Sequence, residues 1–243
     1  MFIRLASFVA LSSVGLALVL GCSSSSDPTP AGSSGTSGQP ATGGTTLRGA
    51  ITGATETGVL DLSVPGATTT TKTLAPLGAP AASNAVTGAI TLSAGGGTIT
   101  LTGTYDAVTG DFTVSGAGYT LTGNLKNGVA TGSYTGPKGA GQFTANATSA
   151  GAVTIYCGSY TAKGDTGNWN VACAAGGACS GSYYSTTKMG GATLTGTLTG
   201  TALSLVTKDG TPANGMLAGT SVMGTCATDG SCTFTGSVAA CTK

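Results

Sequence analysis

Histidine is absent from this 243-residue sequence, and charged residues of both signs together make up only 7% of it. Without an imidazole, the chain lacks the side chain that most often acts as a general base or metal ligand near neutral pH. Nine basic and eight acidic residues give no basic field for the phosphates of a nucleic acid. These shortages exclude histidine-based catalysis and predict no nucleic-acid partner.

Aromatic residues are also scarce, at 5%, whereas glycine supplies 43 residues and the mean hydropathy is positive, at +0.28. Disordered chains combine low hydrophobicity with high net charge. This sequence has neither property, which argues against a disordered chain.

The N-terminal segment has the layout of an export signal. Arg4 precedes an apolar run at residues 5–20, and small residues follow. A helix of that length spans about 24 Å, short of the roughly 30 Å hydrocarbon core, which favours a cleaved signal over a membrane span. The run ends in Val19-Leu20-Gly21-Cys22, which resembles the lipobox of bacterial lipoproteins.

In that family the chain is cut before the cysteine, which then carries the lipid. The resemblance implies a signal peptide at 1–21, lipid chains on Cys22 and a membrane partner bound through them. Ser23 stands where an aspartate would resemble the inner-membrane retention signal, so the expected location is the outer membrane, on its periplasmic or cell-surface face. Cleavage would remove Arg4 and leave no net charge to steer a charged partner.

Residues 22–45 are rich in Ser, Gly, Thr and Pro and offer almost nothing to bury. Such a segment is expected to form a disordered tether with a reach of about 25–30 Å. The folded part is then expected at 46–243.

Apolar residues alternate with Thr or Ser from residue 46 onward, as at 98–105, 112–115 and 192–199. Alternation with a period of two is typical of half-buried antiparallel strands. Asn127-Gly128, Asp209-Gly210 and Asp229-Gly230 are turn dipeptides, and turns of all kinds arrive about every 8–12 residues. Residues 65–84 are expected to form a long loop. The predicted fold is all-β, a Gly/Thr-rich antiparallel meander forming a barrel or a sandwich.

Two further patterns bear on the architecture. Gly103, Gly123 and Gly196 fall in phase with the apolar face, where a missing side chain would let strands coil strongly. The alternative is that these positions only reflect the glycine-rich composition. Residues 120–125 resemble residues 193–198. The resemblance indicates either two related meanders, 46–150 and 151–243, or a coincidence in a sequence rich in Thr and Gly.

Six cysteines besides Cys22 lie between residues 157 and 241, and an even number behind an export signal implies disulfides. Two pairs enclose five turn-like residues each, which predicts Cys173–Cys179 and Cys226–Cys232 as cross-strand bonds. Cys157 and Cys241 would then join the first strand of the second meander to its last. A zinc site is the weaker alternative, because neither His nor a Cys-x2-Cys pair is present.

No residue pattern predicts catalysis. Asp106 and Asp111 are the best pair of carboxylates, but they flank an expected hairpin loop, where Asp is a common turn former. We therefore expect a protein that is not an enzyme, with no cofactor and no metal.

The best candidate binding residues are aromatic: Tyr156, Tyr160, Trp169 and Tyr183, all in the disulfide-bearing half. Rings with polar tips make good contact surfaces for sugars or protein partners, although they also fill cores. The preferred function is structural or adhesive, in a lipid-anchored envelope or cell-surface protein. The alternative is a barrel that binds a small apolar ligand or a glycan, and an open interior lined by rings would favour it.

Metabolic labelling with a fatty-acid analogue tests the anchor. The wild-type protein should incorporate the label and Cys22→Ala should not, because the thiol is the acylated group. Equal labelling of the two proteins would contradict the assignment.

Overall fold

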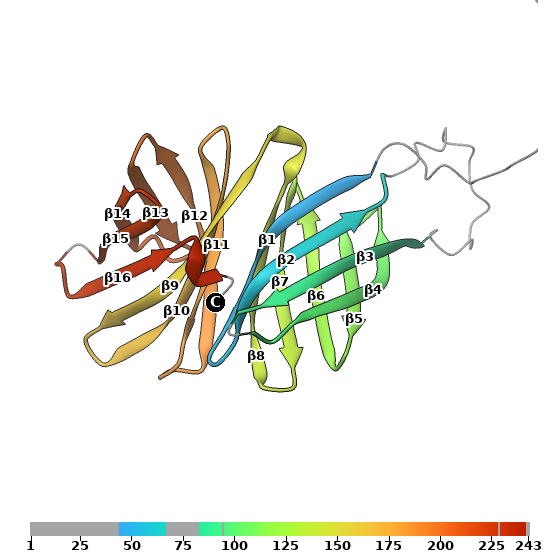
Figure 1. The fold of residues 1–243 in the computed structure, drawn as a ribbon, viewed down its shortest axis with the longest axis horizontal. Coiled ribbons are helices and arrows are strands. Elements are labelled where there is room, and N and C mark those ends of the chain that lie inside the picture. Colours follow the sequence, from blue (N-terminus) through green and yellow to red (C-terminus); the bar gives the residue numbers. More distant parts are fainter. Residues whose placement is uncertain (1–43, 67–82, 94, 228, 242–243) are drawn as a thin grey trace, which may run out of the picture. The chain divides into compact units, whose positions relative to one another are not determined.

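A computed structural model describes residues 44–66, 83–93, 95–227 and 229–241. Most of them form two closed eight-stranded antiparallel barrels, which confirms the all-β prediction. The barrels belong to one compact unit, Pro40–Lys243 (Figure 1). The predicted signal peptide, Cys22, nearly all of the tether and most of the expected 65–84 loop lie outside the described residues. None of the described segments contains a helix long and apolar enough to cross a membrane.

The first barrel is an eight-stranded meander in which β8 closes onto β1. Its strands are β1 (Thr45–Gly53), β2 (Thr57–Val64), β3 (Ser83–Leu92), β4 (Thr98–Asp106), β5 (Asp111–Gly116), β6 (Tyr119–Lys126), β7 (Val129–Gly136) and β8 (Gly139–Ala147).

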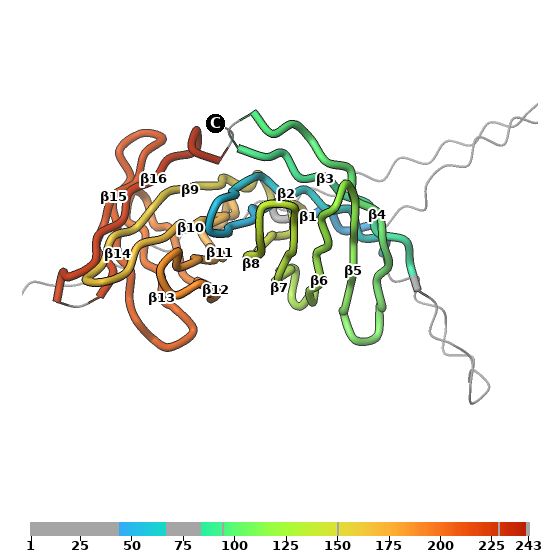
Figure 2. The backbone as a smooth tube through the Cα atoms, turned by 90° about the horizontal axis from the view of Figure 1, so that it is seen from below, coloured from blue at the N-terminus to red at the C-terminus, as the bar shows by residue number. Residues whose placement is uncertain are grey.

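The second barrel has the same order, and β16 closes onto β9 (Figure 2). Its strands are β9 (Val153–Ala162), β10 (Asp165–Ala174), β11 (Ala178–Ser185), β12 (Gly190–Thr199), β13 (Ala202–Thr207), β14 (Pro212–Ala218), β15 (Ser221–Cys226) and β16 (Cys232–Ser237). Short 3-10 turns follow the barrels at Thr148–Ala150 and Ala239–Cys241. The alternative of two meanders, 46–150 and 151–243, placed the division between β8 and β9.

The strand pairs of the two barrels share one register. In the first barrel Gly123 of β6 faces Gly132 of β7, which faces Phe143 of β8. In the second barrel the same places hold, in order, Gly215, Gly224 and Phe234. A Cβ on any of these four glycines would lie within 2.5–2.8 Å of the tip of the phenylalanine ring. The barrels therefore match strand for strand, β1 with β9 and so on to β8 with β16.

The short sequence echo is not the signature of this repeat. Residues 120–125 lie in β6 and residues 193–198 in β12, but the register matches β12 with β4. The echo therefore reflects the common apolar–Thr alternation rather than equivalent strands.

The glycines in phase with the apolar face lie where a neighbouring strand approaches closely. A Cβ on Gly103 would lie 1.8 Å from the carbonyl oxygen of Thr113, and one on Gly196 would lie 1.9 Å from that of Ser204. The predicted hairpin at 127–128 is also confirmed, since Asn127 and Gly128 both have positive φ, 52° and 76°.

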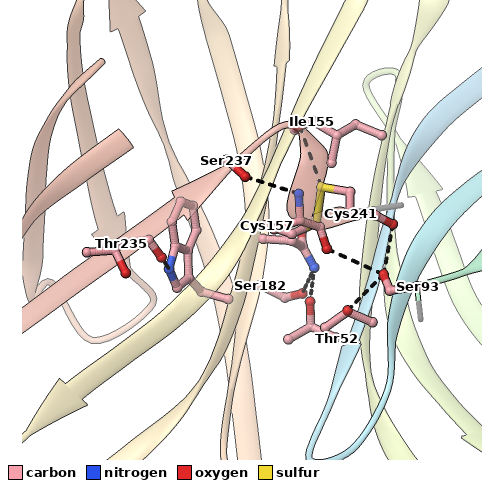
Figure 3. Close-up of a disulfide and its surroundings, with 12 residues drawn as sticks. Thr52, Ser93, Ile155, Cys157, Ser182, Thr235, Ser237 and Cys241 are labelled. Atoms are coloured by element: carbon pink, nitrogen blue, oxygen red, sulfur yellow. Dashed lines mark hydrogen bonds between the residues drawn. A yellow bond between two sulfur atoms is a disulfide. The ribbon is translucent and has the colours of Figure 1, made fainter. Parts of the chain in front are cut away.

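All three predicted disulfides are present: Cys157–Cys241, Cys173–Cys179 and Cys226–Cys232. Figure 3 shows the first of them, which fixes the C-terminal turn to β9. Nearby, the hydroxyl of Ser93 in the first barrel donates to the carbonyl oxygen of Cys241, with the two oxygens 2.8 Å apart.

Polar side chains on the outer faces of β1, β8, β10 and β11 are buried where the two barrels meet. Asn146 donates from Nδ2 to the carbonyl oxygen of Ala172 at 2.6 Å, and Thr144 donates from Oγ1 to that of Gly181 at 3.0 Å. Asn170 donates to the hydroxyl oxygens of Thr52 and Ser182 (Figure 3). Buried polar groups need such partners, so these bonds specify which outer faces meet.

Gly103→Ala should lower the free energy of unfolding by at least about 2 kcal/mol, because the added methyl group overlaps the backbone of β5. Gly176→Ala is the matched control, since nothing lies within 4 Å of its Cβ position, and its effect should stay within about 0.5 kcal/mol. Urea denaturation of both variants measures the difference. Equal effects would contradict the close-approach role of Gly103.

Candidate functional site

The interior of the first barrel is filled with side chains. Its buried core includes large residues from every strand, among them Leu47, Leu60, Ile90, Leu101, Leu121 and Phe143. Glu56, in the turn between β1 and β2, closes one end together with Tyr119 and Tyr134. We call these three residues the plug.

In the plug, the buried carboxylate of Glu56 accepts from one phenol and the backbone carbonyl of Glu56 accepts from the other. The Tyr119 hydroxyl donates to Glu56 Oε1 at 2.7 Å, and the Tyr134 hydroxyl donates to the Glu56 carbonyl oxygen at 3.4 Å. The two rings stack with centroids 6.4 Å apart. Glu56 is only 6% exposed, and its Oε2 accepts no hydrogen bond from any described residue. Lys138 Nζ lies 3.9 Å from Oε1, so an exposed cation faces the buried anion.

This environment raises the pKa of both phenols. Burial and then the hydrogen bond to Glu56 raise the pKa of Tyr119 to about 12. Burial, followed by the charge of Glu56, raises the pKa of Tyr134 as well. Both hydroxyls therefore stay protonated and able to donate across the neutral range.

The second barrel holds a cavity of about 300 Å³ at the matching end. Its aromatic lining is Tyr160, Trp169, Tyr183 and Phe234, and its aliphatic lining includes Leu194, Leu205 and Ala213. Three of the four aromatic residues proposed from the sequence therefore lie together at one cavity. Tyr156 does not line it and is buried in the core of the barrel, 5% exposed.

The indole N–H of Trp169 is not available to the cavity. Trp169 Nε1 donates to the carbonyl oxygens of Ser159 and Thr235, at 3.2 and 3.1 Å, so the indole N–H is satisfied by backbone. Trp169 packs edge-to-face on Phe234, with centroids 5.2 Å apart, and Tyr160 packs in the same way on Tyr183 at 5.9 Å. Each ring is held in place by a neighbour, which gives the cavity a fixed apolar wall.

Polar groups gather at the mouth. Asp165 Oδ1 accepts from the Ser185 hydroxyl at 2.6 Å, and Oδ2 accepts from the Tyr160 hydroxyl at 3.3 Å. Lys188 Nζ lies 3.5 Å from Oδ2. Lys163 and Asp209 also line the cavity and are exposed. Burial is the largest cause that raises the pKa of Tyr160 to about 12.

The register explains why one barrel is filled and the other hollow. Asp165 holds the position of Glu56, since each pairs with the last residue of the preceding strand, Ala162 or Gly53. Leu121 faces Tyr134 in the first barrel, and Ala213 faces Cys226 in the second. Cys226 thus replaces the Tyr134 ring.

Thr211 replaces the Tyr119 ring by the same register. Tyr119 lies two residues before Leu121 on β6, and Thr211 lies two residues before Ala213, the residue at the place of Leu121. Two phenol rings of the first barrel are therefore small side chains in the second, and the cavity occupies that end of the interior.

Sequence reasoning missed Asp165, Glu56 and Phe234. Asp165 follows Lys163-Gly164 and reads as an ordinary turn residue. Asp106 and Asp111 behave as the turn formers expected of them. Asp106 Oδ1 accepts from the backbone N–H of Val108 at 2.8 Å, and hydrogen bonds from Asn124 and Thr109 lower the pKa of Asp111.

Comparisons with protein-family models, curated proteins and solved structures found no match for this chain.

Tyr119→Phe should destabilise the chain by about 1–2 kcal/mol at pH 8, because a buried carboxylate loses a hydrogen bond. The folded pKa of Tyr119, about 12, exceeds the unfolded value near 10. The contribution of the hydroxyl is therefore complete below pH 10 and is lost as the pH rises from 10 to 12. Urea denaturation should show the two proteins converging over that interval. A constant difference would contradict the raised pKa.

Proposed function

We propose that this protein is an exported, lipid-anchored binding protein that holds a small apolar ligand in its second barrel. One observation carries the proposal: the second barrel is hollow at the end where its counterpart is filled. Eight strands enclose a space that side chains either fill or leave for one small ligand. The sequence alternative of a ligand-binding barrel is thereby favoured over a purely structural or adhesive role.

The lining favours an apolar ligand over a glycan. Rings and aliphatic groups form the wall, and the polar groups lie at the mouth. A sugar taken inside would leave several hydroxyls without partners, at a cost of about 1–3 kcal/mol each.

Two disulfides make this site rigid. Cys226–Cys232 joins β15 to β16 at the cavity end, and Cys173–Cys179 joins β10 to β11 at the opposite end. A preformed site loses little conformational entropy on binding. The first barrel then serves as scaffold.

The remaining parts of the proposal come from the sequence. Lipid on Cys22 and the tether at 22–45 would hold the barrels at an outer membrane, within reach of ligands in the envelope. We propose no catalytic step and no cofactor.

Toluene titration, read by the fluorescence of Trp169, tests the function in the soluble Cys22→Ser form of residues 22–243. The chain has one tryptophan, and it lines the cavity. We expect a saturable change with half-saturation at or below about 1 mM, and no response to methyl glucoside.

Ala213→Leu gives the cavity the side chain found at the same place in the first barrel, and it should weaken toluene binding at least about ten-fold. Ala202→Leu makes the same chemical change at an exposed site of β13 and should leave binding unchanged. Wild-type protein without a saturable response, or equal loss in both variants, would contradict the proposed function.

A further inference from the structure

The plug of the first barrel shows which chemical groups pack together at this end of a barrel. There, two phenol rings stack beside a buried carboxylate, with an interplanar angle of 28°, and one hydroxyl donates to the carboxylate at 2.7 Å. In the first barrel, the protein's own side chains thus place an aromatic ring inside the barrel with its hydroxyl donating to a carboxylate.

The second barrel keeps the carboxylate and lacks both rings. Asp165 stands at the place of Glu56, Thr211 at that of Tyr119 and Cys226 at that of Tyr134, and all three residues line the cavity. The cavity therefore combines an apolar space beside these positions with an acceptor at its mouth.

Asp165 has capacity for one more donor. It accepts one short hydrogen bond from Ser185 and one long bond, 3.3 Å, from Tyr160. A carboxylate has about four acceptor sites, so an incoming hydroxyl can bind beside these donors. The lining also contains the negative charge of Asp209 and the positive charge of Lys163, and Lys188 lies beside Asp165. The two negative charges thus balance the two positive ones. This mouth does not favour an anionic ligand.

We propose that the ligand is a neutral phenol-like ring, whose apolar body lies against Trp169 and Phe234 and whose hydroxyl donates to Asp165. This proposal rests on the proposed function and names its ligand class. A cavity without an acceptor would prefer toluene to phenol, because an unpartnered hydroxyl loses its hydration. A cavity with a buried acceptor discriminates in the opposite direction.

Phenol and toluene are the matched probes, since they differ only by a hydroxyl in place of a methyl group. Calorimetry and Trp169 fluorescence on the Cys22→Ser form of residues 22–243 should show phenol binding at least ten-fold more tightly than toluene. Benzoate, a ring with an anionic group, should bind at least ten-fold more weakly than phenol.

Two variants assign the preference to Asp165. In Asp165→Asn the phenol-to-toluene ratio should fall below three-fold, because the charged acceptor is gone. In Tyr160→Phe the ratio should stay or rise, because Asp165 Oδ2 loses its internal donor. Thr211→Tyr, which restores the ring of the plug, should abolish phenol binding.

The ligand class would be overturned if toluene bound as tightly as phenol, or if the preference for phenol survived in Asp165→Asn. In either case, saturable binding of toluene would leave the proposed function intact. If Asp165→Asn fails to fold, Tyr160→Phe decides, since loss of the preference there would overturn the role of Asp165. Absence of binding by both probes would contradict the ligand class and the proposed function together.

Discussion

Closure of eight strands sets the size of the interior of each barrel, whichever side chains point into it. Strand number and tilt set the diameter, and the enclosed space must then be filled by side chains or left to a ligand. Glycines at the tightest approaches, such as Gly103 and Gly196, allow this closure because neighbouring backbone occupies the place of their Cβ atoms. Every feature of the candidate site follows from how the two interiors fill the same space.

The first barrel fills its interior with large residues and the plug. The second barrel has three rings on β9, β10 and β11, where Tyr160, Trp169 and Tyr183 stand in place of Ile51, Leu60 and Ile90. It has small residues at Thr211, Ala213 and Cys226 instead. Rings on one side and small groups on the other leave a cavity with an aromatic wall, and this wall supports the proposed binding function.

The cysteines show how far spacing alone carries a prediction. Five intervening residues between strand-like flanks predict a cross-strand bond, and both such pairs are bonded. The pairing of Cys157 with Cys241 followed by elimination and by the expectation that the last strand returns to the first. Since β16 does pair with β9, the C-terminal turn brings Cys241 back to the closing strand.

By itself the sequence determined the all-β class, strands such as those at 98–105 and 192–199, the hairpin at 127–128, the disulfides and three of the four aromatic residues at the cavity. Alternation, turn dipeptides and cysteine spacing predict these features because they act over a few residues. Closure into two barrels of common register, the burial of Glu56 and the place of Asp165 at a cavity mouth were decided only by the tertiary structure. These features depend on contacts between strands far apart in the chain, such as Tyr119 with Glu56, 63 residues away. An acidic residue in a turn has the same local pattern whether it faces solvent or a barrel interior, and only the packed neighbours decide which.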